Sequence, residues 1–125
     1  MTRLVVALAV ALLVCLVPTP SFAADKAAPP AGVTLSGEIV DLACYISHGA
    51  KGPDHASCAA KCVEMGQPMG LAADDGKVYV LVADHADTSA FGKAKSMAGK
   101  KVEIKGDVAA KDGMSVLTVH AVKTI

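Results

Sequence analysis

The chain has few of the residues on which several common functions depend. Its 125 residues include no Trp and only 3% aromatic residues, so it lacks the stacking platform that proteins use to bind single-stranded nucleic acid. Its 12 basic residues equal its 12 acidic residues in number, which gives no positive excess to attract nucleic acid or anionic lipid. No GxSxG or HExxH motif occurs. We therefore expect no nucleic-acid partner and no hydrolase activity.

One long apolar run is present, and it lies at the N-terminus. Arg3 precedes residues 4–17, which are all apolar, and small residues follow at the positions that signal peptidase recognises. This arrangement is typical of a secretory signal peptide over residues 1–23, because the run is shorter than the ~20 residues of a membrane-spanning helix. We expect a periplasmic or secreted protein with no membrane attachment after cleavage. Residues 24–32 are rich in Ala and Pro and predict a flexible lead-in to one domain over residues 33–125.

The domain is predicted to begin with a strand, a loop and a helix. Residues 33–43 alternate between apolar and polar side chains as a strand does, and Gly37 in their middle predicts a bulge or sharp bend. Residues 45–53 contain two Gly and one Pro and predict a loop. Asp54 is a suitable N-cap for a helix over residues 55–65, since its carboxylate can accept from a free amide of the first turn.

The second half of the chain predicts four strands and one helix. The predicted elements are a hairpin with arms at residues 70–73 and 77–83, a helix over residues 88–98, and strands over residues 100–108 and 114–123. Phe91, Ala94 and Met97 or Ala98 form the predicted buried stripe of the helix, and Val102 and Ile104 the predicted inner face of the following strand. These elements give a mainly β chain with two short helices, an α+β domain.

The order of these elements resembles that of a known architecture. Without the first helix, the order is that of the five-stranded OB-fold, and residues 33–125 resemble small exported bacterial domains of this kind. The resemblance implies a barrel with a cysteine-bearing helical insert between strands 1 and 2, at a rim where OB-folds commonly contact ligands. The strand GEIVDLACY followed by a CxxxC helix is also similar to uncharacterised periplasmic proteins of bacteria, a similarity that implies no activity.

The insert carries the residues that point to chemistry. Cys44, Cys58 and Cys62 are the cysteines that remain after the predicted signal peptide, and His48 and His55 lie among them. Thiolate and imidazole are preferred ligands of soft and borderline cations, and His48 or His55 would complete the Cys3His set of a zinc site. Our leading hypothesis is therefore a copper or zinc ion held for handling, delivery or sensing rather than catalysis, with another exported protein as a possible partner.

Two other interpretations of the cysteines stay open. In an oxidising compartment cysteines normally pair, so Cys44 bridged to Cys58 or Cys62 would make the domain a disulfide-stapled binding module, with one thiol left over. A thiol redox protein is the second alternative and the one enzymatic role considered, because Cys58 lies near the start of the predicted helix, where the dipole favours thiolate.

Three further residues bear on the choice of metal and on the ligand geometry. Met65 and Met69 flank the end of the predicted helix, where their thioethers would favour Cu(I), although packing in the core is the simpler role. Asp41 either orients a histidine near Cys44 or is a solvated carboxylate at the end of the strand.

Overall fold

A computed structural model describes residues 31–125, so the predicted signal peptide and residues 24–30 of the lead-in lie outside the described part. Residues 31–125 form eight elements: β1 (Ala31–Asp41), α1 (Leu42–His48), α2 (Ala56–Glu64), β2 (Met69–Ala73), β3 (Val78–Ala83), α3 (Ser89–Lys95), β4 (Lys101–Lys111) and β5 (Met114–Thr124). Within residues 31–125, no helix combines the length and the apolar character that a membrane crossing needs.

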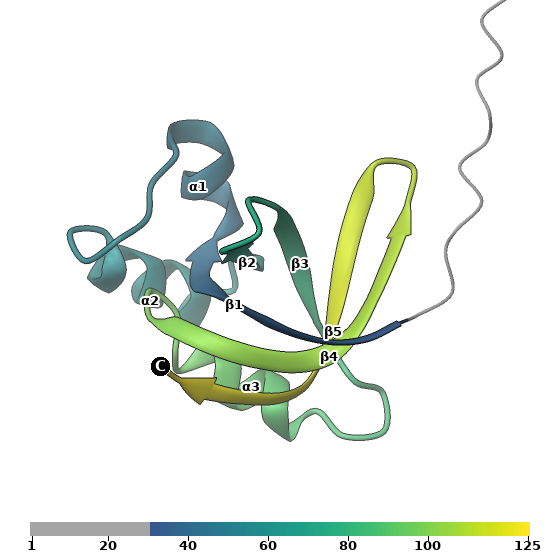
Figure 1. The fold of residues 1–125 in the computed structure, drawn as a ribbon. Helices are drawn as coiled ribbons and strands as arrows, with labels where there is room; N and C mark the ends of the chain where they lie inside the picture. The colour runs from purple at the N-terminus through teal and green to yellow at the C-terminus, as the bar shows by residue number, and fades with distance from the viewer. Residues whose placement is uncertain (1–30) are drawn as a thin grey trace, which may run out of the picture.

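The five strands close into a barrel in the order β1-β2-β3-β5-β4. β3 and β5 pair in parallel, and all the other neighbours pair antiparallel. This topology confirms the predicted α+β barrel of OB type. The helices α1 and α2 lie between β1 and β2 at one end of the barrel, whereas the β4–β5 hairpin projects at the other end (Figure 1).

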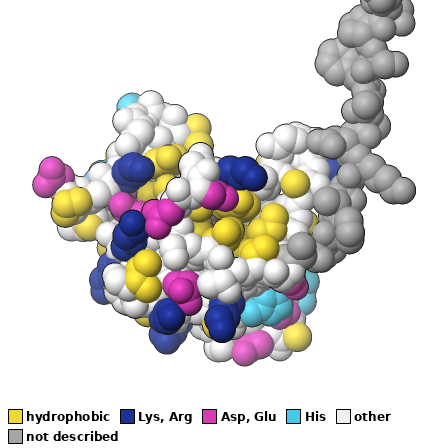
Figure 2. Space-filling model, viewed as in Figure 1, with side chains coloured by type: hydrophobic (Ala, Val, Ile, Leu, Met, Phe, Trp, Pro, Cys, Tyr) yellow, Lys and Arg dark blue, Asp and Glu magenta, His cyan; other side chains and the backbone are white. Residues whose placement is uncertain are grey.

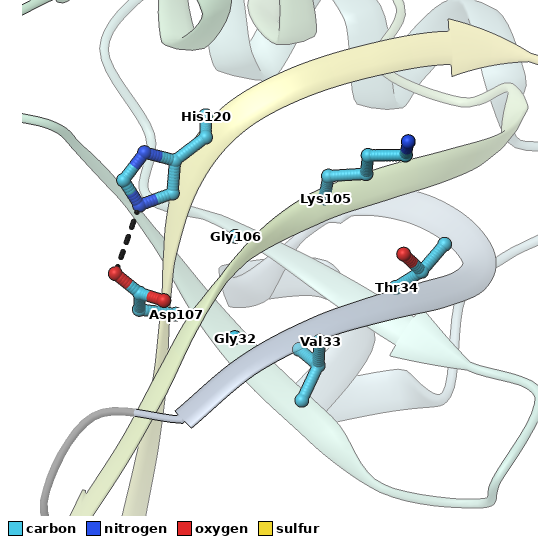
Figure 3. Close-up of a pocket in the computed structure, with 7 residues that line it drawn as sticks. All are labelled: Gly32, Val33, Thr34, Lys105, Gly106, Asp107 and His120. Atoms are coloured by element: carbon cyan, nitrogen blue, oxygen red, sulfur yellow. Dashed lines mark hydrogen bonds and ion pairs between the residues drawn. The ribbon is translucent and has the colours of Figure 1, made fainter.

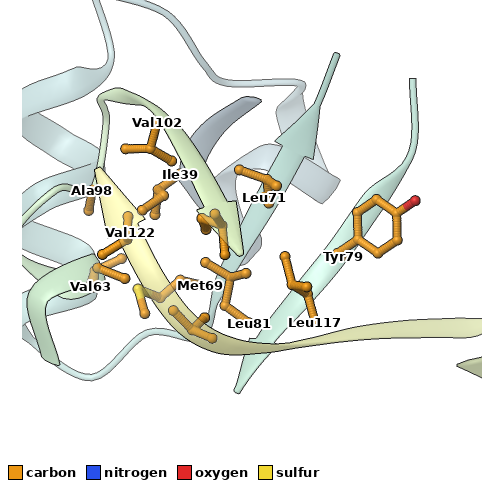
Figure 4. Close-up of a cluster of buried hydrophobic side chains, with 13 residues drawn as sticks. Ile39, Val63, Met69, Leu71, Tyr79, Leu81, Ala98, Val102, Leu117 and Val122 are labelled. Atoms are coloured by element: carbon orange, nitrogen blue, oxygen red, sulfur yellow. The ribbon is translucent and has the colours of Figure 1, made fainter. Parts of the chain in front are cut away.

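The core follows from the alternation of apolar residues along the strands. Ile39, Leu71, Ile104 and Leu117 come from four different strands and are all fully buried. Figure 4 labels Ile39, Leu71 and Leu117 within this cluster. Val102 and Ile104 point inward as predicted. On α3 and the turn that follows it, Ala94 and Ala98 are buried in the same cluster while Phe91 and Met97 pack against it, which confirms the predicted stripe. Charged side chains of both signs are mixed over the face seen in Figure 2.

Two glycines permit the strands to approach each other closely. A Cβ on Gly37 would collide with the backbone of Ala72 in β2, and a Cβ on Gly106 would collide with the backbone of Thr118 in β5. The pairing of β1 with β2 and β4 continues through Gly37 without a shift of register. The irregularity falls in the β4–β5 pairing instead, where Lys105 pairs with Ala121 and Gly106 with Val119, so that His120 of β5 is skipped. Of the bulge or sharp bend predicted at Gly37, the bulge is therefore wrong, and the absence of a side chain at Gly37 permits close backbone packing.

The predicted strand to residue 43 ends early, because α1 begins directly after β1. Asp41 is the N-cap of α1, and its side chain accepts a hydrogen bond from the backbone N–H of Cys44. Gly49 ends the helix in the left-handed region at φ 67°. The predicted loop over residues 45–53 is thus half helix. Residues 31–125 contain three short helices where the sequence predicted two.

Two smaller boundaries also differ. β1 begins at Ala31, whose Cα partner is Val108, so the last two residues of the predicted lead-in belong to the barrel. Asp54 does not cap α2, because His55 holds the N-cap position and makes no side-chain capping bond. A backbone turn in which the His55 N–H donates to the Gly52 carbonyl leads into the helix instead.

Candidate metal centre

Asp41 contacts residues at the starts of both helices of the insert. Its side chain is 0% exposed, and such burial of a carboxylate is costly unless its oxygens are bonded. Oδ1 accepts from the Cys44 N–H at 2.8 Å, and Oδ2 lies 3.2 Å from Nε2 of His55. One buried carboxylate thereby fixes both the first turn of α1 and the ring of a histidine fourteen residues further along the chain.

The loop that carries His55 is held to β1 by a second carboxylate. Gly52 donates its N–H to Oε1 of Glu38 at 2.7 Å, and the His55 N–H donates to the Gly52 carbonyl at 3.0 Å. Glu38 and Asp41 both belong to β1, so the rigid strand sets the position of the loop. His55 is therefore placed by the barrel and not only by its own helix.

Cys44 completes a group of three possible ligands. One ligand atom each from Asp41, Cys44 and His55 lie within 4.8 Å of one another, and Cys44 and His55 are partly accessible. Carboxylate, thiolate and imidazole are all ligands of zinc, while thiolate and imidazole also suit copper. Asp41, Cys44 and His55 form a group that could hold a metal ion.

Two further thiols lie beside this group on α2. Cys58 and Cys62 are one helical turn apart, and their Sγ atoms are 3.9 Å from each other. Cys62 also lies close enough to Cys44 of α1 for each thiol to change the pKa of the other. All three cysteines are free, with Cys58 exposed and Cys44 and Cys62 partly buried. The insert thus brings three thiols, one imidazole and one carboxylate to one end of the barrel.

Crowding of groups that can become negative changes their proton affinities. Burial raises the pKa of Cys44, and the neighbouring Asp41 carboxylate raises it further. Burial, then the contact with Cys58 and the charges nearby, raises the pKa of Cys62 to about 11. Burial alone would raise the pKa of Asp41 as well, but the bonds from the Cys44 N–H and His55 hold it below its ordinary value of 3.8. A cation bound here would relieve the repulsion among these groups.

The structure separates the other predicted ligands from this group. His48 is the exposed last residue of α1 and is not among the three clustered ligands. Met69 belongs to the hydrophobic core, whereas Met65 at the end of α2 is 70% exposed. Of the predicted ligands, Cys44 and His55 are therefore brought together with Asp41, Cys58 and Cys62 lie next to each other on α2, and His48 is not part of the group.

Sequence reasoning undervalued two carboxylates, Asp41 and Glu38. Asp41 had two predicted roles, and the structure bears out the one in which it orients a histidine near Cys44. The spacing of Asp41 three residues before Cys44 was the available signal, because an Asp at an N-cap accepts from the amide two or three positions later. Nothing in the spacing from Glu38 to Gly52 marks their contact.

A second histidine cluster lies on the side of the barrel. His120 of β5 places Nδ1 3.2 Å from Oδ2 of Asp84 and Nε2 3.1 Å from Oδ2 of Asp107. The ring borders an open groove of about 370 Å³ between β1, β4 and β5, where its bond to Asp107 is visible (Figure 3). Carboxylates occupy both ring nitrogens, so neither nitrogen is left for a metal. The cluster links the β3–α3 loop to the barrel wall.

Comparisons with known proteins leave the assignment to the structure. No protein-family model matches the chain, and neither a curated protein nor a solved structure matches it.

Proposed function

We propose that the protein binds one copper or zinc ion at the insert and serves in metal handling, delivery or sensing in the periplasm or outside the cell. The observation that carries the proposal is the clustering of ligand atoms from Asp41, Cys44 and His55 within 4.8 Å. Cys58 and Cys62 supply two more thiolates beside it. The ion would be the cargo of the protein and not a catalyst.

Asp41 is suited to a supporting role in such a site. Histidines that bind metals commonly hold their second ring nitrogen against a carboxylate, which fixes the tautomer and the orientation of the ring. The carboxylate of Asp41 contacts Nε2 of His55, which leaves Nδ1 of the ring for the ion. The proposed ligands are therefore Cys44, Cys58, Cys62 and His55, the Cys3His set expected from the sequence, with His55 rather than His48 as its histidine.

The partial exposure of the group favours exchange over a purely structural ion. Cys58 is exposed and Cys44 and His55 are partly exposed, so an incoming ligand from another protein can reach the ion. Structural zinc sites are commonly closed by four protein ligands that solvent does not reach. A second exported protein that offers thiolate or imidazole would be the exchange partner.

Metal titration tests the proposal. We expect the reduced protein from Ala24 onward, handled without oxygen, to take up one equivalent of Zn(II) or Cu(I) against a chromophoric competitor. The Cys44→Ser variant should lose this uptake, and His120→Ala should retain it. Equal binding by the wild type and Cys44→Ser would contradict the proposed site. Competition between the two ions would rank copper and zinc.

The disulfide-stapled module remains the second candidate. The predicted export of the chain supports this candidate, because the cysteines of exported proteins normally form disulfides. Under this alternative, the protein recovered from the exporting cell would hold a bridge from Cys44 to α2 and would take up no metal. Reduction would lower its thermal stability. The same titration, done with and without prior reduction, separates the two candidates.

A further inference from the structure

The two cysteines of α2 are arranged differently from Cys44. They are four residues apart on one helix, with Sγ atoms 3.9 Å apart, whereas Cys44 lies on α1. A rise of ~1.5 Å per residue puts their Cα atoms about 6 Å apart, inside the range that a disulfide spans. Cβ atoms four residues apart on a helix are about 5–6 Å from each other, beyond the ~3.5–4.5 Å of a disulfide, so the first turn of α2, which holds Cys58, must open for the bond to form.

Their exposure assigns them different roles in thiol chemistry. Cys58 is exposed and can meet an incoming disulfide, while Cys62 is partly buried, with its Sγ 3.9 Å from that of Cys58. In such a pair, the accessible cysteine attacks the incoming disulfide, and the less accessible cysteine then resolves the mixed disulfide. Cys44 lies on the other helix of the insert. The bond from its backbone N–H to Asp41 fixes its position at the start of α1.

We propose that Cys58 and Cys62 form a redox-active dithiol that gates the metal site; this inference rests on the proposed function. The oxidant is a small-molecule disulfide. The Cys58 thiolate attacks one of its sulfurs, the S–S bond breaks, and the first thiol leaves with a proton while a mixed disulfide remains on Cys58. Cys62 then attacks Cys58, forms the Cys58–Cys62 bond and expels the second thiol, and its own proton balances that thiol.

Oxidation of Cys58 and Cys62 to a disulfide would weaken metal binding at the site. Two of the three thiolate donors become disulfide sulfurs, which are poor ligands, because the thiolate is the form that binds metal. Asp41, Cys44 and His55 would remain, a weaker set for a soft ion. The reduced protein therefore holds the ion and the oxidised protein releases it.

Disulfide mapping tests the pairing. The reduced protein from Ala24 onward keeps the complete barrel and three cysteines, and it is treated with oxidised glutathione. We expect loss of two thiols and two hydrogen atoms in the wild type and equally in Cys44→Ser. Cys58→Ser and Cys62→Ser should instead gain one glutathione as a stable adduct. An internal bridge in Cys58→Ser would join Cys44 to Cys62 and would overturn the assignment.

Metal affinity tests the gating. We expect oxidation to weaken Zn(II) binding more than about tenfold, since loss of a group outside the ligand set already costs about 10- to 100-fold. A dithiol reductant should restore the affinity. Unchanged Zn(II) affinity after complete oxidation would overturn the gating and leave the metal site standing. A reduced protein that takes up no Zn(II) would contradict the site and its gating together, whatever the disulfide map.

Discussion

The described part of the chain contains two histidine–carboxylate clusters that differ in their surroundings. His55 lies 3.2 Å from Asp41, and His120 lies 3.2 and 3.1 Å from Asp84 and Asp107. The side chains of His55 and Asp41 are 20% and 0% exposed, whereas those of His120, Asp84 and Asp107 are 42%, 26% and 42% exposed. Contact distance therefore does not distinguish the clusters, but burial does.

The chemistry available to the two histidines differs as well. His55 has one carboxylate on one ring nitrogen and thiols nearby, while His120 has a carboxylate on each nitrogen. A histidine can bind a metal only through a nitrogen that is free of other bonds. Both clusters have a histidine–carboxylate contact, so this contact does not make the insert a candidate metal site. The thiols and the free ring nitrogen of His55 do.

The largest expected difference is in metal affinity after loss of each histidine. His55→Ala should weaken Zn(II) binding by more than about 100-fold, because loss of a ligand should exceed the 10- to 100-fold cost of losing an outer partner. His120→Ala should leave the affinity unchanged. Competition titration of the two reduced variants measures both values, and similar losses in both would remove the distinction between the clusters.

Replacement of the carboxylates should give a smaller difference. Asp41→Asn keeps the shape and an acceptor for the Cys44 N–H but removes the charge that faces His55. We expect metal affinity to fall by about 10- to 100-fold, the usual cost of losing a carboxylate that orients a histidine ligand. Asp107→Asn is the matched control and should have no effect. An unaltered affinity in Asp41→Asn would show that the carboxylate does not support the site.

The same contrast should appear in stability without metal. Asp41→Ala leaves the Cys44 N–H and the His55 ring without a partner in a buried place, which should lower the free energy of unfolding by about 1–3 kcal/mol. Asp107→Ala breaks an exposed pair and should cost less than about 1 kcal/mol. Urea unfolding of the reduced, metal-free proteins measures both, and a larger loss in Asp107→Ala would reverse the comparison.

The smallest expected effect is in the pH dependence of stability. Because the pKa of Asp41 is lowered in the fold, its stabilisation is complete above the pKa of the unfolded chain, about 3.9, and is lost as the pH falls through the folded value. The wild type and Asp41→Asn should therefore differ most near neutral pH and converge in acid. A constant difference between pH 7 and pH 3 would contradict the assigned shift.

The barrel could be predicted because its signals are local. Val102 and Ile104 alternate with charged residues along β4, and this pattern alone places them in the core. The helix α1 could not be predicted in the same way, since LACYISH has no clear helical stripe. Its start depends on the Asp41 cap and on the Leu42 N–H, which donates to the Pro68 carbonyl 26 residues away.

The candidate site was predictable in its residue types but not in its geometry. The three cysteines marked the insert, yet His48 and His55 were equivalent by sequence because both lie among them. The fold distinguishes the two histidines. The loop before α2 is hydrogen-bonded to Glu38 of β1, and His55 at the end of this loop lies against Asp41. Contacts across fourteen residues depend on tertiary packing, and no spacing rule gives them.

Native mass spectrometry of protein recovered from the exporting cell, without exposure to a chelator, shows whether the protein carries a metal ion. We predict a mass above that of the polypeptide by one copper or zinc ion, lost on acidification and missing from Cys44→Ser. A metal-free polypeptide lighter than the reduced chain by two hydrogen atoms, with Cys44 bridged to Cys58 or Cys62, would contradict the account and favour the disulfide-stapled module.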